Sequence, residues 1–324
     1  MEWMESKWDL AMDGFLNFNK PVGLTSHDCV AKVRRLLGQK RIGHAGTLDP
    51  GATGVLPIAL GRATRLLPFL LPTKAYHATI RLGVQTTTDD LEGEVLQVKS
   101  AAHLTLAMVQ EALQPFQGVI QQLPPRYSAV QVRGKRLYEL ARTGQAVEVQ
   151  PRPVEVFQLT ILDWHPAERA DLEVEIVCGS GTYIRSIARD LGAVLQTGGT
   201  LAALLRTESS GFHLEDSLCL DDLEAQIRSG TFHPIAPEMA LAHLPAIALT
   251  ATLAKRWCQG QRLFLERLDE LPVIPLMDWS KPYLTVRIHN VAGEFLGITQ
   301  LSRQEDGFLF QPQVVYLPWE VGLA

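Results

Sequence analysis

The stretch from Gly43 to Gly61 constrains this chain more than any other segment, because five glycines and two prolines surround one carboxylate, Asp49. Glycine is kept where the backbone needs a positive φ or approaches another group closely, and Pro50 biases Asp49 toward extended geometry. Residues 55–60 form an apolar run that predicts a buried strand. Asp49 is therefore expected on a tight loop that leads into a rigid strand, a setting that suits a functional residue. An ordinary turn aspartate that caps a loop is the alternative interpretation.

The chain has 324 residues, more than one hydrophobic core usually organises, so about two domains are expected. No apolar run approaches the ~18–20 residues that a membrane-spanning helix needs. The N-terminus lacks the basic start and apolar core of a signal peptide, and a cytoplasmic protein is expected. The four cysteines form no Cys-x-x-Cys pair, so neither a zinc site nor a disulfide framework is indicated: Cys29, Cys178, Cys219 and Cys258.

Charge is unevenly distributed along a chain whose net charge is −5. Between residues 20 and 81 there are ten basic residues and two acidic ones, whereas residues 208–324 hold fifteen acidic and eight basic ones. One basic face on an otherwise acidic protein is a plausible footprint for phosphate binding. The alternative is that these charges coat the exposed sides of amphipathic helices.

Residue periodicity predicts alternating strands and helices up to about residue 245, followed by a small, mostly β module. The predicted strands are 14–19, 55–60, 74–82, 93–98, 154–162, 172–178, 283–288, 294–301 and 314–319. The predicted helices are one that starts at Thr25 or Ser26 and ends at Gly38, then 62–71, 104–116, one that opens at the Gly179–Arg185 turn, 221–227 and 250–258. Residues 121–153 contain Pro124-Pro125, basic turns and one short helix, 137–142, so they are expected to form a basic, mobile excursion from the core.

Together these segments resemble the TruB-type tRNA pseudouridine synthases. The resemblance rests on Gly-His-x-Gly-x-Leu-Asp-Pro-x-Ala-x-Gly-x-Leu-Pro from Gly43, and it covers residues 14–212. One departure is Thr87, where the family pattern has an acidic residue. The further motifs that match are Tyr76, Pro124-Pro125-x-Tyr127-Ser128-Ala129, Gly181-Thr182-Tyr183-Ile184-Arg185 and Leu204-x-Arg206-Thr207.

The resemblance implies an α+β fold, with a mixed, mainly antiparallel central sheet flanked by helices and loops. It implies a catalytic domain over residues 14–245, with an RNA-gripping insertion at about 121–153. The tail, 246–324, resembles the small PUA-like RNA-binding domain of bacterial members.

The activity that the resemblance implies is conversion of the T-loop uridine of tRNA, conventionally position 55, to pseudouridine. This isomerisation involves no redox change, so no cofactor and no metal are expected. The expected partner is the T-arm of tRNA. The protein is expected to act as a monomer and not to associate with a membrane.

The family motifs also imply roles for individual residues. Asp49 matches the essential carboxylate, and Arg185 matches the arginine that pairs with it. Without the motif, Arg185 would be read as a surface helix charge and Tyr76 as a core residue. The other substrate-binding positions that match are Tyr76 and Leu204 against the two faces of the uracil, Lys20 beside the pocket, His44 as the residue that fills the vacated base stack, and Tyr183.

Three alternatives to this activity remain open at the level of sequence. The first is an RNA-binding protein without catalysis, which the intact Asp49, Tyr76 and Arg185 disfavour. The second is a nucleoside hydrolase or glycosylase, which would need a positioned water and usually a cluster of metal ligands. The third is a synthase that acts on another RNA. The sequence also leaves open whether Asp49 attacks C1′, attacks C6 or deprotonates C2′ first.

Overall fold

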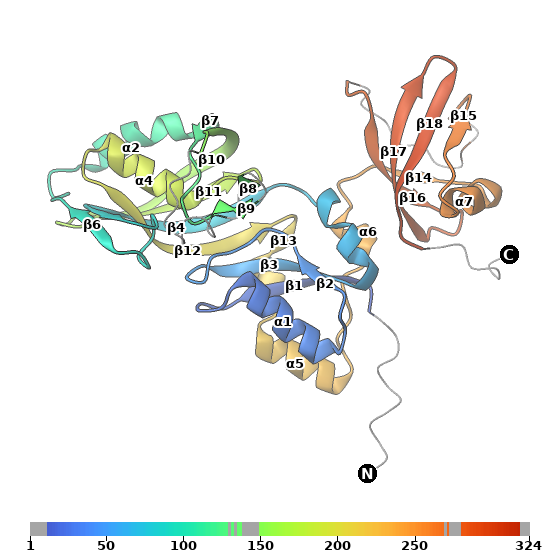
Figure 1. Ribbon diagram of the computed structural model, residues 1–324, viewed down its shortest axis with the longest axis horizontal. Coiled ribbons are helices and arrows are strands. Elements are labelled where there is room, and N and C mark those ends of the chain that lie inside the picture. The colour runs from blue at the N-terminus through green and yellow to red at the C-terminus, as the bar shows by residue number, and fades with distance from the viewer. Residues whose placement is uncertain are drawn as a thin grey trace, which may run out of the picture.

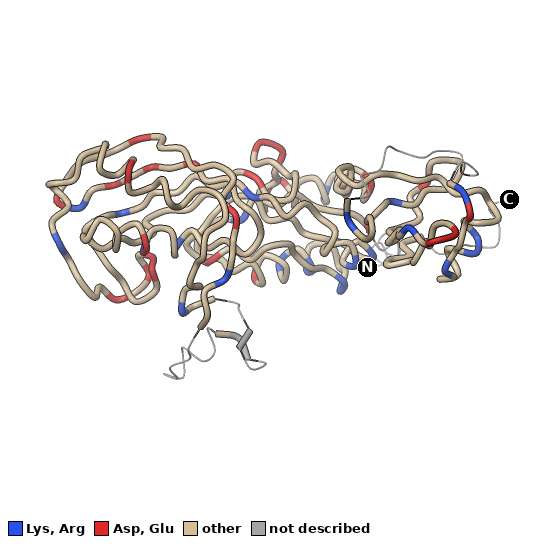
Figure 2. Tube along the Cα trace, turned by 90° about the horizontal axis from the view of Figure 1, so that it is seen from above, with Lys and Arg blue, Asp and Glu red and all other residues tan. Residues whose placement is uncertain are grey.

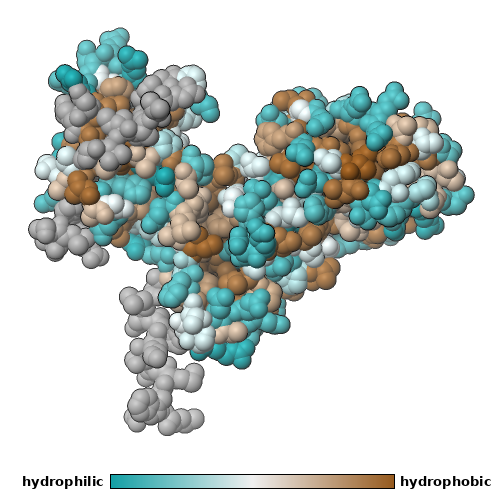
Figure 3. Space-filling model, turned by 180° about the vertical axis from the view of Figure 1, so that it is seen from behind, coloured by the Kyte–Doolittle hydropathy of each residue, from teal (hydrophilic) through white to brown (hydrophobic). Residues whose placement is uncertain are grey.

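The computed structural model describes residues 12–128, 131–132, 135–137, 149–268, 271 and 280–317. Within these residues the chain forms two large sheets in separate bodies, one with nine strands and one with five. From behind, a notch separates the two bodies (Figure 3). This mixture of sheets and helices confirms the predicted α+β class.

The nine-stranded sheet has the order β1-β3-β12-β4-β11-β10-β7, with β2 beside β3 and β13 beside β12 (Figure 1). Its neighbouring strands are antiparallel except for β12 and β3, which are parallel. The late strand β12 therefore lies between two early ones. The strands are β1 (Gly14–Lys20), β2 (Ile42–His44), β3 (Thr53–Leu60), β4 (Lys74–Leu82), β7 (Gly118–Gln122), β10 (Arg152–His165), β11 (Asp171–Cys178), β12 (Gly199–Ser209) and β13 (Phe212–His213).

Helices cover different halves of this sheet. Apolar residues of α2 (Leu106–Leu113) and α4 (Ile184–Val194) share one core cluster with β4 and β11. A second cluster joins α1 (Ser26–Leu37) and α5 (Leu220–Ser229) to β1 and β3 (Figure 1). A short helix, α6 (Pro237–Ala240), follows α5 in the chain.

The ends of α1 follow directly from the sequence. Thr25 is the N-cap and forms a capping box with Asp28, while Gly38 ends the helix with φ 62°. These local bonds confirm the predicted start and end of the helix.

Two predicted helices are shorter than the periodicity suggested, because a proline interrupts each one. Residues 62–71 form two 3-10 turns, Gly61–Arg65 and Leu67–Phe69, and Pro68 lies in the second. Helix α2 stops at Leu113, and a 3-10 turn with Pro115 at its centre completes the segment. The predicted helix 137–142 lies outside the described residues, apart from Leu137.

The five-stranded sheet has the order β14-β16-β17-β18-β15 and packs against α7 (Ala251–Cys258) through the buried Trp257. The predicted hairpin between β16 and β17 is confirmed. The prediction of a last strand at 314–319 was wrong, because β18 begins at Gly307, carries Pro312 at a register shift against β17 and ends at Val315; residues 318–319 lie outside the described residues. The domain boundary predicted at residue 245 stays a prediction. The strands are β14 (Ala246–Ala248), β15 (Leu263–Leu265), β16 (Leu284–His289), β17 (Phe295–Gln304) and β18 (Gly307–Val315).

The described segments also form two small ribbons. One pairs β5 (Val84–Thr86) with β6 (Val95–Val98), which agrees with the strand predicted at 93–98. The other pairs β8 (Gln131–Val132) with β9 (Lys135–Arg136) inside the predicted insertion. No helix in the described ranges is both long and apolar enough to cross a membrane.

The two bodies share an apolar cluster. Phe15 and Val55 of the first sheet lie in one buried cluster with Phe295 and Tyr316 from the C-terminal end. Arg62 donates from Nη1 to the Tyr316 carbonyl at 3.2 Å and lies 5.3 Å from its ring centroid. These contacts hold the C-terminal sheet against the first body.

Helix α4 approaches β12 at a glycine. A Cβ atom at Gly192 would lie 2.0 Å from the backbone nitrogen of Gly199. Gly192→Ala is expected to push α4 away from β12 and to lower the free energy of unfolding by about 1–3 kcal/mol, as overpacking does. Thermal denaturation measures this loss, and Val194→Ala on the exposed side of the same helix is the control. An unchanged melting temperature for Gly192→Ala would contradict the close packing.

Candidate active site

Asp49 and Arg185 form an ion pair at the centre of the candidate site. Arg185 stands in the first turn of α4, and its Nε lies 2.9 Å from Oδ2 of Asp49. The Arg185 side chain is 6% exposed and that of Asp49 is 41% exposed. The structure thus brings together a fixed buried cation and a carboxylate that remains open to a pocket.

Lys20 holds the loop that carries Asp49 through hydrogen bonds to its backbone. This side chain is fully buried at the end of β1, and its Nζ donates to the carbonyls of Ala52 at 2.6 Å, Pro21 at 3.0 Å and Pro50 at 3.2 Å. Burial lowers the Lys20 pKa. Because all three acceptors are backbone oxygens, the lysine fixes the loop conformation without forming a hydrogen bond to the Asp49 carboxylate.

Every nitrogen of the Arg185 guanidinium has a partner. Nη1 donates to the Thr88 carbonyl at 3.0 Å and Nη2 to the Tyr127 carbonyl at 2.9 Å. Nη1 also lies 3.7 Å from Oδ2 of Asp90, so two carboxylates share one arginine. These contacts fix the orientation of the planar guanidinium group.

Asp90 was not predicted from the sequence. The acidic residues nearest Thr87 are Asp89 and Asp90, and both face α4 in the structure: Asp90 contacts Arg185, and Asp89 Oδ2 lies 3.0 Å from Arg189 Nη1. An acidic pair opposite two arginines one helical turn apart is a pattern that could have indicated this contact.

The pocket in front of the pair has a volume of ≈ 70 Å³ and is lined by Asp49, Asp90, Arg185 and Leu204, among others. The surroundings raise the pKa of Asp49 above its ordinary value of 3.8, chiefly through burial and also through the nearby Asp90. The Arg185 cation opposes this shift. The site therefore holds the carboxylate in a poorly solvated but charge-compensated state.

The raised Asp49 pKa predicts how activity changes with pH. With the ionised carboxylate as the predicted reactive form, turnover should fall as pH drops through a pKa that lies above 3.8. Single-turnover rates on T-arm RNA across mildly acidic pH measure this limb. A rate that stays flat down to the range of an ordinary aspartate would contradict the assigned environment.

Tyr76 and Leu204 come from the neighbouring strands β4 and β12. Tyr76 is directly opposite Arg206 in the ladder, and Leu204 is opposite Ala78. Leu204 lines the pocket, whereas Tyr76 is 5% exposed and is not among the residues that line it. Burial raises the Tyr76 pKa, and the Arg206 cation partly opposes the shift.

Tyr183 and His44 are not among the residues that line this pocket. Tyr183 is the N-cap of α4, and its backbone N–H donates to Oε1 of Gln122 at 2.7 Å. His44 ends β2, and its ring meets that of His27 edge-on at a centroid distance of 5.4 Å. Burial lowers the pKa of His44 to about 4, so this ring is neutral at neutral pH.

Arg206 is a second residue whose place was not predicted, although it belongs to a motif recognised in the sequence. It is fully buried in β12, with Nε donating to the Val55 carbonyl at 2.6 Å and Nη2 to the Gly46 carbonyl at 3.0 Å. A charged residue in an otherwise apolar strand was the pattern that could have indicated it. Arg206 thus links β12, β3 and the loop before Asp49.

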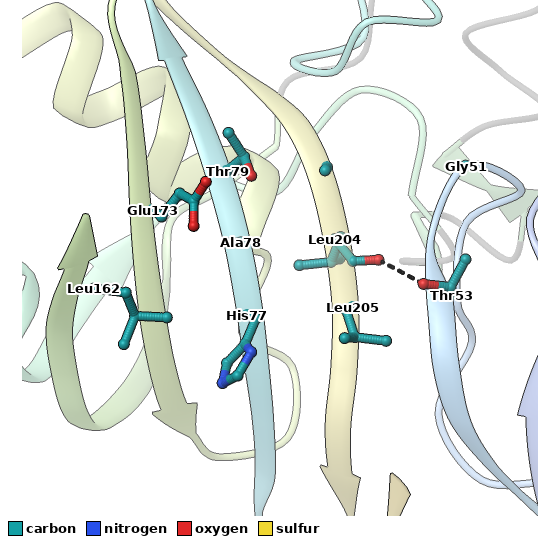
Figure 4. Close-up of a pocket in the computed structure, with 10 residues that line it drawn as sticks. Gly51, Thr53, His77, Ala78, Thr79, Leu162, Glu173, Leu204 and Leu205 are labelled. Atoms are coloured by element: carbon teal, nitrogen blue, oxygen red, sulfur yellow. Dashed lines mark hydrogen bonds between the residues drawn. The ribbon is translucent and has the colours of Figure 1, made fainter. Parts of the chain in front are cut away.

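A second depression, of ≈ 290 Å³ (Figure 4), adjoins the pocket in front of the ion pair and shares Gly51, Ala203 and Leu204 with it. The hydroxyl of Thr53 donates to the Leu204 carbonyl at 3.5 Å on its wall. Its lining includes none of the predicted site residues other than Leu204. In the described part of the chain, no group of three or more His, Cys, Asp or Glu side chains could hold a metal ion.

Comparison with known proteins identifies the family of this chain. Residues 34–184 match the model of the TruB family pseudouridylate synthase N-terminal domain. The chain is 59% identical to "tRNA pseudouridine synthase B" of Trichormus variabilis over 78% of this chain and 87% of that protein. It is 52% identical to the protein of the same name from Acaryochloris marina over 94% of this chain and 99% of that protein.

The fold is also similar to solved structures. A chain from a Cbf5-Nop10-Gar1 complex superposes with a TM-score of 0.71 at 25% identity, covering 98% of this chain and 92% of that one. With the family match, the high identity to curated relatives and the shared fold, this chain belongs to the TruB family of pseudouridylate synthases.

Proposed function

We propose that this protein converts the T-loop uridine at position 55 of tRNA to pseudouridine, with Asp49 as the essential carboxylate. The observation that supports it most strongly is the 2.9 Å pair between Asp49 and the buried Arg185. Curated relatives at 49–60% identity carry the name "tRNA pseudouridine synthase B", which favours tRNA as the substrate.

The chemistry needs one carboxylate and controlled proton transfer. The C1′–N1 bond breaks, the uracil turns, and C5 bonds to C1′; the proton on C5 then leaves and N1 ends protonated. Positive character that develops at C1′ is stabilised by a nearby carboxylate, as in glycoside hydrolysis. Asp49 fits this role because Arg185 offsets the burial that would otherwise favour its neutral form.

The remaining predicted residues have supporting roles in this proposal. Leu204, on the pocket wall, would pack against one face of the uracil, and Tyr76 would stack on the other and help to move the proton from C5 after rejoining. Lys20 would hold the Asp49 loop through its three carbonyl contacts. Tyr183 would line the entrance beside α4.

The target base is stacked inside the folded T-loop, so it has to be flipped into the pocket. The neutral ring of His44 is suited to fill the vacated stack, because an uncharged aromatic face is compatible with base stacking.

Lys and Arg positions gather along the lower edge in the middle of Figure 2, where RNA phosphates would be contacted. The candidate phosphate contacts are Lys32, Arg34, Arg35, Lys40 and Arg41, with the insertion at about 121–153 and a PUA-like RNA-binding domain at 246–324 as further contacts.

The proposed enzyme works as a cytoplasmic monomer. Its catalytic domain spans residues 14–245. The reaction as written consumes no oxidant or reductant, so the proposal includes no cofactor and no metal.

Tritium release from C5-labelled uridine tests this function. The substrates are tRNA transcripts with the normal T-loop and transcripts in which the target uridine is replaced by cytidine. Release is expected only from the first, because the C5 proton leaves only when C5 bonds to C1′. Equal release from both transcripts, or none from either, would overturn the proposal.

A further inference from the structure

Two cationic side chains converge beside the loop that carries Asp49. A Cβ atom at Gly46 would lie 3.1 Å from Nζ of Lys74 and 3.3 Å from Nη1 of Arg206. Gly46 has a φ of +73°, and it has no side chain to fill this space. Both nitrogens therefore face the open side of one glycine.

Within the residues that the structure describes, no carboxylate compensates the positive charge at this point. Nη1 of Arg206 is buried and has no hydrogen-bond partner among the described residues, although the other side of the guanidinium contacts the carbonyls of Val55 and Gly46. Across the described ranges, no carboxylate forms an ion pair with Lys74 or Arg206. Burial and the Arg206 charge lower the pKa of Lys74 to about 8. Burying a cation with an unpaired N–H donor costs folding free energy unless an anion pairs with it.

The converging pair is within reach of a ligand from solvent. Gly46 and Lys74 are half-buried, and the next residue after Gly46, Thr47, is exposed. Arg206 supplies the buried side of the site, while the longer and more accessible Lys74 supplies the outer side. An oxyanion with two free oxygens suits this arrangement, because each nitrogen donates to a separate oxygen.

We propose that Lys74 and Arg206 form an anion site that binds one backbone phosphate of the RNA next to the target uridine. Gly46 lies three residues before Asp49, and Lys74 lies two residues before Tyr76 on the same strand. The site is therefore close to the nucleotide whose ribose meets Asp49, and the phosphates that flank that nucleotide are the nearest anions of the substrate. This inference rests on the proposed function.

A double-mutant cycle tests the site: it combines the substitution of Lys74 with the neutralisation of single phosphates in the RNA. T-arm RNAs are made with one neutral methylphosphonate at each linkage around the target uridine, and their Kd values are measured for the full-length protein and for Lys74→Met. One linkage is expected to weaken wild-type binding about tenfold when neutral, and Lys74→Met to bind natural RNA about tenfold more weakly. At that linkage alone, the loss on neutralisation should be clearly smaller for the variant than for the wild type, because the lysine contact is already gone and only the Arg206 contact remains to be lost.

Lys99→Met is the matched control, since Nζ of Lys99 donates to the Gln196 carbonyl at 3.2 Å and is exposed. It removes the same charge and should leave the effect of each neutral linkage unchanged. Losses that add at every linkage, or Lys74→Met with wild-type affinity, would overturn the phosphate site. A wild-type protein that neither binds nor modifies the natural T-arm would instead overturn the proposed function, so the two failures are distinguishable.

Discussion

Asp49→Asn is expected to lower pseudouridine formation by about a thousandfold or more while tRNA still binds. Asparagine has almost the same shape, so Lys20 still holds the loop through backbone carbonyls at 2.6–3.2 Å. What is lost is the negative charge that stabilises or traps the cationic C1′ centre. Tritium release under single-turnover conditions measures the chemical step, and a filter-binding Kd measures retention of RNA.

Asp171→Asn is the matched control for this change. Asp171 is also paired with an arginine, because Arg81 donates to both of its oxygens at 2.7–2.8 Å, but the pair lies outside the pocket that Asp49 lines. This variant loses the same charge and should retain turnover. If Asp49→Asn keeps a rate within tenfold of wild type, the carboxylate is not the essential group.

Arg185→Lys is expected to reduce turnover about a hundredfold or more, with a much smaller loss of RNA affinity. The guanidinium of Arg185 contacts Asp49, Thr88 and Tyr127 at once, and a lysine ammonium cannot reproduce that fork. Asp49 would then keep a nearby charge but lose its fixed orientation. Its pKa should rise further, which moves the acidic limb of the pH–rate profile upward.

Arg189→Lys provides the comparison on the same helix. Arg189 pairs with Asp89 and Asp190 one turn further along α4 and has no contact with Asp49. Its substitution should affect stability more than turnover. Equal losses of turnover and binding for Arg185→Lys would show that the pair with Asp49 serves binding and not catalysis.

Much of the fold is encoded in short-range patterns. Helix α1 was predicted with its ends because Thr25 and Gly38 act within a few residues of the chain. Strand β12 was not assigned, because register shifts at Ala203 and Glu208 disturb its alternation and Arg206 interrupts its apolar pattern. Its central place in the sheet depends on pairing with β3 and β4, and a local window does not contain that information.

The candidate site also contains residues that the sequence identified and residues that only the structure revealed. Asp49 and Arg185 were found through motifs, and the structure places them 2.9 Å apart. Asp90 and the orphan donor of Arg206 were not found, because their significance comes from distances between segments. In physical terms, the sequence identifies which residues carry charge, and only the packed structure shows which charges lack a partner.

The position of β12 has a consequence for how the protein is made. Gly46 and Arg206 are 160 residues apart in the chain, so the loop that carries Asp49 leaves the ribosome on the order of ten seconds before the strand that anchors it. Until then, the facing edges of β3 and β4 are unpaired, and each half of the sheet has to survive as an open fragment. We expect nascent chains that end before Gly199 to be protease-sensitive and unable to modify RNA, with both properties changing together once residue 209 is exposed.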